Sequence, residues 1–147
     1  MKKRILSILL LCCMVLTLLP VTAFAAAKIE VGTEAELLAA LADNTIDKIT
    51  LTADITVSQT LKIDRQVVLV LDHSLKVDRE QSSSGTLFHI TKSGYLDTNA
   101  GSITDNVLNE GRFFPRQISG EVINEGEIIR GSFSGMVKNR GSINNGS

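Results

Sequence analysis

A seven-residue pattern that occurs three times decides the fold, as Val107-Leu108-Asn109-Glu110-Gly111-Arg112-Phe113, as Val122-Ile123-Asn124-Glu125-Gly126-Glu127-Ile128 and as Val137-Lys138-Asn139-Arg140-Gly141-Ser142-Ile143. The asparagine and the glycine of the pattern each recur with a 15-residue period. Other columns match at the same period: Ile118 with Phe133, Gly120 with Gly135, and Gly131-Ser132 with Gly146-Ser147. So many columns that agree at one period identify a tandem repeat.

The repeat unit predicts short strands rather than helices. The unit is too short for a helical-hairpin repeat, and it is rich in glycine and β-branched residues. Phe133, Val137 and Ile143 divide one unit into three similar parts, which predicts a coil with three sides per turn. A five-residue side spans at most about 16 Å, so the interior holds little beyond one apolar side chain per side. Successive turns would stack about 4.8 Å apart, with equivalent residues above one another.

Stacking of this kind gives the repeated polar residues structural roles. We predict that Gly111, Gly126 and Gly141 occupy corners that need a positive φ or have no room for a Cβ. We also predict a structural ladder of side-chain amides, in which each amide bonds to the next turn. Its members are Asn109, Asn124 and Asn139. A row of asparagines that binds a ligand is the alternative, because it would need the same spacing.

The segment before the repeats predicts a helix followed by the first coils. Thr33 and Glu36 fit a capping box, so we expect a capping helix over residues 33–43 with Leu37, Leu38 and Leu41 on its apolar face. Over residues 46–77 apolar residues then alternate with polar ones, as in half-buried strands. Glycine is missing from residues 33–84, which argues against tight hairpins. Residues 78–86 read as a loop, and residues 87–147 as the coils that carry the 15-residue repeats.

Residues 1–25 have the features of a secretory signal peptide. A basic start precedes an apolar stretch, and Ala23 and Ala25 supply the small residues of a cleavage site. Both cysteines lie in this segment, so residues 26–147 cannot form a disulfide. They carry 12 basic and 16 acidic residues, a net charge of −4 that argues against binding to nucleic acid. We predict a secreted or cell-envelope protein, with no membrane span after cleavage.

The early strand pattern resembles a known family. The stretch Ile46-Asp47-Lys48-Ile49-Thr50-Leu51-Thr52-Ala53-Asp54-Ile55-Thr56-Val57, with the later Leu61-Lys62-Ile63 and Val68-Leu69-Val70-Leu71-Asp72-His73-Ser74-Leu75, is similar to the opening coils of pectate-lyase-like parallel β-helix proteins. In that family a short helix covers the N-terminal end, and residues 34–42 would match it. The glycine- and asparagine-rich repeat resembles those of secreted or surface-attached proteins of Gram-positive-type bacteria. The resemblance implies an all-β parallel β-solenoid with a short N-terminal capping helix after the signal peptide.

Candidate catalytic residues are scattered along the sequence. By resemblance, a polysaccharide lyase would cluster acidic Ca²⁺ ligands with a basic residue, which makes Asp97, Asp105 and Arg112, or Asp72 with His73, the candidates. Charges of both signs alternate in the repeat columns, as on a solvated surface. His73 and His89 lack the third ligand pattern of a zinc site. We therefore predict no catalytic residue, no cofactor and no metal site.

Aromatic side chains that could contact a sugar are few. Phe113 and Phe133 fall in core columns, which leaves Tyr95 and Phe114 as the plausible contacts. Packing of Phe114 and Pro115 at a corner is the alternative.

The last repeat predicts a solenoid that is open at its C-terminal end. An open coil leaves backbone groups unpaired. We expect that the natural protein continues beyond Ser147, so that this chain is a truncated solenoid, and end-to-end self-association through the uncapped coil is the alternative. The predicted function is a structural or adhesive surface module without catalytic activity, with carbohydrate or a host or cell-surface protein as its partner. The rival is the N-terminal part of a polysaccharide-degrading enzyme whose catalytic coils lie beyond residue 147.

Overall fold

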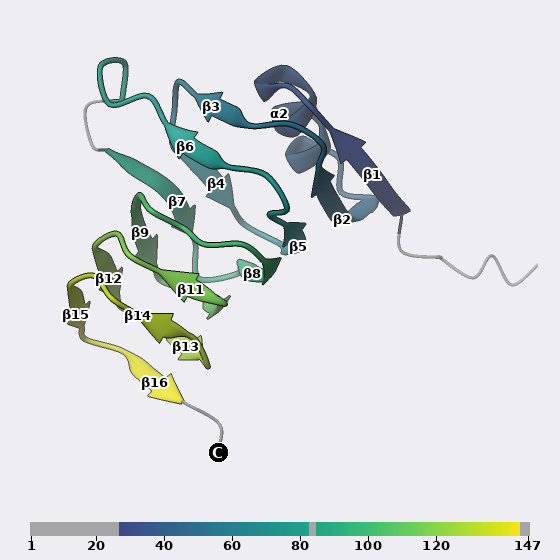
Figure 1. Ribbon diagram of the computed structural model, residues 1–147. Helices are drawn as coiled ribbons and strands as arrows, with labels where there is room; N and C mark the ends of the chain where they lie inside the picture. The colour runs from purple at the N-terminus through teal and green to yellow at the C-terminus, as the bar shows by residue number, and fades with distance from the viewer. Residues whose placement is uncertain (1–26, 83–84, 145–147) are drawn as a thin grey trace, which may run out of the picture.

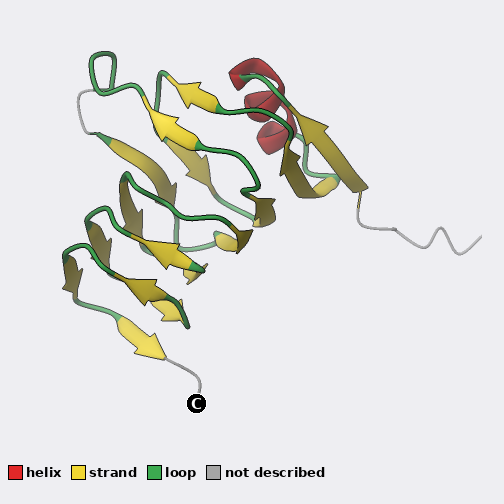
Figure 2. Ribbon diagram, in the orientation of Figure 1, coloured by secondary structure: helices red, strands yellow, loops and turns green. Residues whose placement is uncertain are grey.

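The computed structural model describes residues 27–82 and 85–144, and it confirms a parallel β-solenoid of about six turns with one short N-terminal helix (Figures 1 and 2). The predicted cleavage residues Ala23 and Ala25 lie outside the described residues. Every strand pair found in the described part of the chain is parallel. The chain therefore winds in one direction without hairpins.

The strands lie on three faces of the coil, as the three-sided repeat predicted. The first face is a seven-stranded sheet of β1 (Ala27–Val31), β2 (Ile46–Leu51), β5 (Gln66–Val70), β8 (Tyr95–Ala100), β10 (Arg112–Phe114), β13 (Glu127–Ile129) and β16 (Ser142–Asn144). The second is a five-stranded sheet of β4 (Leu61–Ile63), β7 (Thr86–Ile90), β9 (Asn106–Asn109), β12 (Val122–Asn124) and β15 (Val137–Asn139). The third consists of two short sheets, β3 (Ile55–Val57) with β6 (Leu75–Val77) and β11 (Gln117–Ile118) with β14 (Ser132–Phe133).

The turns differ in length along the axis, and the last ones are the shortest. Ile49 pairs with Leu69, which is a longer step along the chain than the step from Leu96 to its partner Phe113. The turn that lies between the two turns just compared is longer than either of them. It is longer because the segment that contains residues 78–82 leaves the coil between β6 and β7 (Figure 1). From Phe113 onward, paired residues are separated by the period of the sequence repeat, as Phe113 pairs with Ile128 and Ile128 with Ile143. The second half is thus a narrower solenoid that continues the first.

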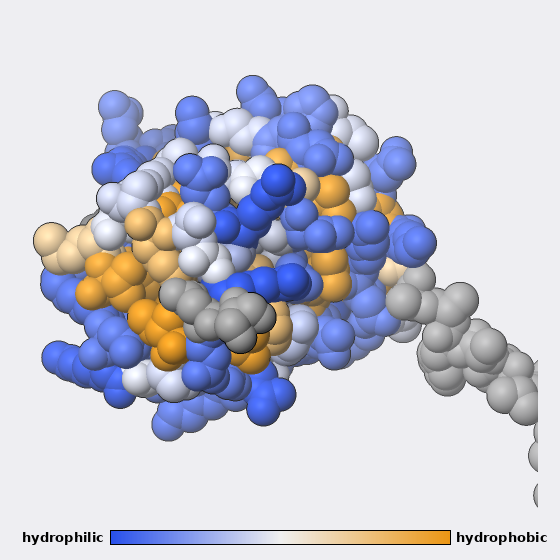
Figure 3. Space-filling model, turned by 60° about the horizontal axis from the view of Figure 1, so that its bottom comes forward, coloured by the Kyte–Doolittle hydropathy of each residue, from blue (hydrophilic) through white to orange (hydrophobic). Residues whose placement is uncertain are grey.

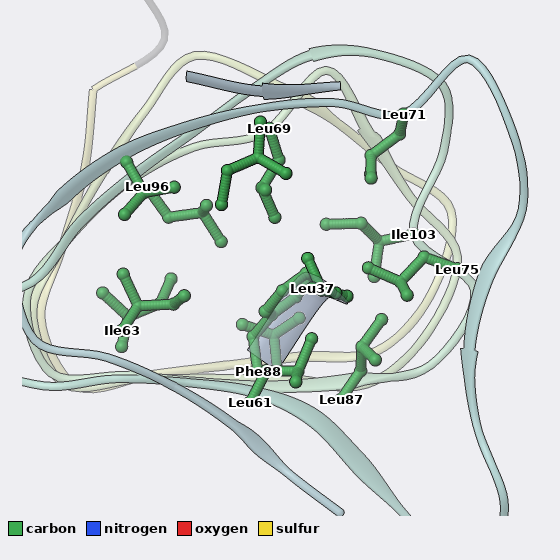
Figure 4. Packing of buried hydrophobic residues seen from close by; sticks show 14 of the residues in the cluster. Leu37, Leu61, Ile63, Leu69, Leu71, Leu75, Leu87, Phe88, Leu96 and Ile103 are labelled. Carbon is green, nitrogen blue, oxygen red and sulfur yellow. The ribbon is translucent and has the colours of Figure 1, made fainter. Parts of the chain in front are cut away.

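Inward-facing residues of the three faces form one apolar core. Strand alternation sends every second side chain inward, and these residues are almost entirely aliphatic, with Phe88 and Phe113 as the fully buried aromatics. Figure 4 shows side chains of this cluster filling the cross-section of the coil. Phe133, Val137 and Ile143, in the last turn, are only partly buried. Figure 3 brings the lower end of the Figure 1 view forward and shows hydrophobic surface beside hydrophilic surface. Met136, in the last full turn, is 62% exposed.

The helix α2 (Glu34–Ala42) covers the N-terminal part of the core. Thr33 and Glu36 form the predicted capping box, and the hydrogen bond from the Gly32 backbone, followed by those from Thr33, lowers the pKa of Glu36. Leu37 is fully buried, but Leu38 and Leu41 are only partly buried. The predicted apolar face is therefore shifted, and Ala40 is its second buried residue.

Arg65 joins the end of this helix to the solenoid. Its guanidinium donates to the carbonyls of Ala40 at 3.0 Å and Asp43 at 2.8 Å at the helix end, and to the carbonyl of Ile46 in β2 at 2.6 Å. The last turn of α2 contains no basic residue of its own. Arg65 therefore supplies the positive charge and the donors that the free carbonyls at a helix C-terminus require.

The predicted asparagine column lies at the junction of the second and first faces. Asn109 Nδ2 donates to Asn124 Oδ1 at 2.7 Å, and Asn124 Nδ2 donates to Asn139 Oδ1 at 2.6 Å. The same two nitrogens also donate to the carbonyls of Glu127 and Ser142, both at 3.1 Å. Asn109 and Asn124 are fully buried, so water cannot replace these partners.

The predicted corner glycines stack on one another beside this column. A Cβ on Gly126 would collide with the carbonyl oxygen of Gly111, and a Cβ on Gly141 would collide with that of Gly126. A Cβ on Gly111 would likewise meet the carbonyls of Thr91 and Gly94. None of Gly111, Gly126 and Gly141 has a positive φ. We predicted that these glycines either need a positive φ or have no room for a Cβ. The structure shows that the second reason applies.

Replacement of Asn124 by alanine should destabilise the solenoid. The change removes both hydrogen bonds that Asn124 donates and leaves the buried Asn109 amide with one of its two acceptors, which costs about 1–3 kcal/mol. We expect a melting temperature several degrees below that of the wild type in thermal unfolding followed by circular dichroism. Asn44→Ala, at an exposed position, is the matched control. Equal melting of the two variants would show that the amide column contributes nothing to stability.

Replacement of Gly126 by alanine should lower the free energy of unfolding more than the same change at Gly32 does. The added methyl of Gly126→Ala meets backbone atoms of Gly111 and Glu110, which move only if the turn spacing changes. The corresponding atom at Gly32 meets the side-chain oxygen of Thr52 at 3.2 Å. Overpacking typically costs about 1–3 kcal/mol. Denaturant unfolding of both variants measures the difference, and a Gly126→Ala protein as stable as Gly32→Ala would contradict the close stacking.

Candidate functional site

The outer surface of the first face brings together two aromatic residues and several charged ones. In β8 the inward Leu96 separates Tyr95 and Asp97, which therefore point outward. In β10 the inward Phe113 likewise leaves Phe114 pointing outward. Phe114 pairs with Asp97 across the two strands, so the side chains of both lie next to each other on this surface.

A groove of about 400 Å³ opens beside these residues, where the first face bends toward the third. Its lining includes Asp97, Asn99, Phe114, Pro115, Arg116 and Arg130. These residues come from three successive turns, since Asp97 and Asn99 belong to β8, Phe114 to β10, and Arg130 follows β13. The site is thus a product of stacking and not of any single sequence segment.

The ring of Phe114 lines the groove, and the ring of Tyr95 packs against it. The ring centroids of Tyr95 and Phe114 are 4.7 Å apart, with an angle of 34° between the ring planes. The guanidinium carbon of Arg130 lies 5.9 Å from the centroid of the Phe114 ring, within the range of a cation–π contact. Arg130 Nη2 is also 3.9 Å from Asp97 Oδ2. Arg130 therefore reaches back across β10 to the residues of β8.

Arg130 adopts an unusual backbone conformation. Its φ of 61° is the one positive value among the non-glycine residues that the structure describes. Gly131 follows with a φ of 127°, and a Cβ there would approach Pro115 at 2.9 Å, which explains why the next residue is glycine. A left-handed conformation is costly for a residue with a side chain and is concentrated at functional sites.

The candidate residues for a lyase site are not brought together. Asp97 lies in the groove, but Asp105 is buried elsewhere, where it accepts from the Val77 backbone at 2.9 Å and from Arg79 Nη2 at 2.9 Å. Arg112 pairs with Glu127, with 3.3 Å between Nε and Oε2. Within residues 27–82 and 85–144, no group of three or more His, Cys, Asp or Glu side chains is arranged to hold a metal ion.

The two histidines have separate acidic neighbours. His89 Nε2 lies 2.8 Å from Glu110 Oε2 on the second face. His73 Nδ1 lies 3.7 Å from Asp54 Oδ1, so its acidic neighbour is Asp54 and not the Asp72 considered from the sequence. These contacts pair each histidine with a carboxylate and do not join them in one site.

The sequence reasoning missed the two arginines of the groove. It considered Tyr95 and Phe114 as sugar contacts and Asp97 as a catalytic candidate, but it connected neither to Arg116 or Arg130. One signal was present, because the 15-residue period aligns Arg130 with Pro115, directly after Phe114. That period could not reveal Asp97, because the turn from Asp97 to its partner Phe114 is longer than the repeat.

Among the described residues, no helix combines the length and the apolar character needed to cross a membrane. No curated protein and no solved structure matches the chain. Residues 28–114, more than half of the chain, match the family described as "Putative pectate lyase-like adhesive domain". These residues include β8 and β10, and therefore Tyr95, Asp97 and Phe114, whereas Arg116 and Arg130 follow the match. The chain belongs to the pectate lyase-like adhesive domain family, and its β-solenoid is a module of that family.

Proposed function

We propose that the protein is a secreted or cell-surface adhesive module that has no catalytic activity of its own. Its mechanism is geometric: stacked turns form a stiff support, and the outer surface of the first face presents side chains to a carbohydrate or protein partner. The signal-peptide pattern of residues 1–25 and the adhesive description of the family support this proposal.

The groove on the first face is the observation that carries the proposal. It combines the aromatic ring of Phe114, against which Tyr95 packs, with the charged side chains Asp97, Arg116 and Arg130 on a parallel sheet. Recognition sites combine apolar surface with a few convergent polar groups in this way. The lyase candidates Asp105 and Arg112 each have another partner, which favours binding over catalysis.

Experiments on the mature secreted protein can distinguish the adhesive function from the lyase function. We expect it to be retained, saturably, on immobilised polysaccharide or on cell surfaces, and to release no unsaturated product from polygalacturonate in the presence of Ca²⁺. Binding is measured by surface plasmon resonance and product formation by ultraviolet absorbance, with heat-unfolded protein as the control. An increase in absorbance that depends on the protein and on Ca²⁺ would replace the adhesive proposal by the enzymatic one.

A further inference from the structure

The groove between β8 and the corner that follows β13 contains polar side chains with unused hydrogen-bonding capacity. The side chain of Asp97 is only 22% exposed, yet its nearest cationic partner, Arg130 Nη2, is 3.9 Å away, which is too far for a hydrogen bond. No other described residue donates a hydrogen bond to its carboxylate. A carboxylate that is mostly buried normally accepts several hydrogen bonds. The Asp97 oxygens are not among the buried atoms without a partner, so they are accessible from the groove and can accept from a ligand there.

Two further polar side chains at the groove have no partner among the described residues. Arg116 is exposed, and its guanidinium takes part in no hydrogen bond or ion pair in the part of the chain that the structure describes. The same holds for the side-chain amide of Asn99. Arg116 can only donate, whereas Asn99 can both donate and accept. The groove thus offers acceptors at Asp97, donors at Arg116, and both a donor and an acceptor at Asn99.

The backbone holds this arrangement in place. The Arg116 backbone N–H donates to Thr98 Oγ1 at 3.3 Å, and Thr98 is buried directly after Asp97, so the two polar ends of the groove are tied together. Arg130 keeps its unfavourable φ and is fixed by a 2.8 Å hydrogen bond from its backbone N–H to the Asn144 carbonyl. The backbone that carries the groove residues is therefore held in place before any ligand arrives.

We propose that this groove binds a sugar unit of a glycan. The hydroxyls of a sugar both donate and accept, so neighbouring hydroxyls can satisfy the Asp97 carboxylate and the Arg116 guanidinium at once. The apolar C–H face of the sugar ring packs on the ring of Phe114, which Tyr95 supports from outside the groove lining. This assignment rests on the proposed adhesive function and specifies its site and its ligand class.

The groove carries the guanidinium groups of Arg116 and Arg130 and the one carboxylate of Asp97, so its charges admit a neutral or an acidic sugar. The positive charge of Arg130 is partly compensated by Asp97 and lies over the Phe114 ring. An acidic sugar can direct its carboxylate to the unpartnered Arg116 and keep it away from Asp97, where like charges repel. Every sugar unit carries hydroxyl donors and acceptors beside an apolar face. A peptide partner would have to present the same combination over the width of a sugar ring.

The test compares the binding of polysaccharides by the mature wild-type protein and by groove variants. The probes are galactomannan, xyloglucan and dextran as neutral chains, and alginate as an acidic chain, in affinity gel electrophoresis followed by calorimetry on the chain that binds most tightly. We expect at least one of these chains to bind, and Asp97→Asn and Arg116→Ala each to weaken its Kd by about tenfold or more, as expected for hydrogen bonds to charged groups. The matched controls are Asp47→Asn and Arg140→Ala, at exposed positions away from the groove lining, which should stay within about twofold of the wild type.

The outcomes separate this assignment from the broader adhesive proposal. If the wild type binds a polysaccharide or a cell surface but both groove variants bind equally well, the groove is not the site, although adhesion stands. Binding only to proteins, with no binding to any polysaccharide, overturns the ligand class. If the wild type binds no probe and no cell surface, both proposals fail. Thermal unfolding of each variant shows whether a weaker Kd reflects the groove or loss of the fold.

Discussion

In-register parallel pairing between successive turns is the constraint on which the rest of this structure depends. Each backbone ladder places a residue directly over its equivalent one turn earlier, as Ile128 lies over Phe113 and under Ile143. Like residues then form columns, and each column must be compatible with turns that stack closely. Apolar columns make the core, the Asn109–Asn124–Asn139 column satisfies its own amides, and the column that contains Gly126 has no space for a side chain.

The same constraint explains why the two ends of the solenoid differ. The first turns are wide, as the pairing of Ile49 with Leu69 shows, and the helix α2 covers their interior by inserting Leu37. Arg65 then binds the free carbonyls at the helix end, so that the covering element is attached to the coil by charge as well as by packing. The later, shorter turns enclose less volume, and a few aliphatic residues with an occasional phenylalanine fill them. This narrow interior accounts for an aromatic content of only 4%.

The groove arises where these two parts of the solenoid meet. Asp97 belongs to a turn that is longer than the repeat, while Phe114 and Arg130 belong to the regular repeats, so the corner positions do not superimpose as they do further along. Arg130 occupies its corner with a positive φ and reaches back over Phe114 to Asp97. A perfectly regular stack would repeat one surface at every turn, whereas this change of period creates a single site. The proposed sugar-binding function depends on that irregularity.

Local patterns determined the repeating architecture, and the stacking register decided the site. The capping box at Thr33 and Glu36, the alternating apolar residues of the first coils and the tandem repeat predicted the helix, the strands and a three-sided solenoid. These features can be read from the sequence because they depend on neighbours in the chain or on one constant period. The contacts of Arg65 with the helix end, and the meeting of Asp97, Phe114 and Arg130, could not be read in this way. They join residues across turns of unequal length, and only the folded path of the chain sets which of them come to lie together.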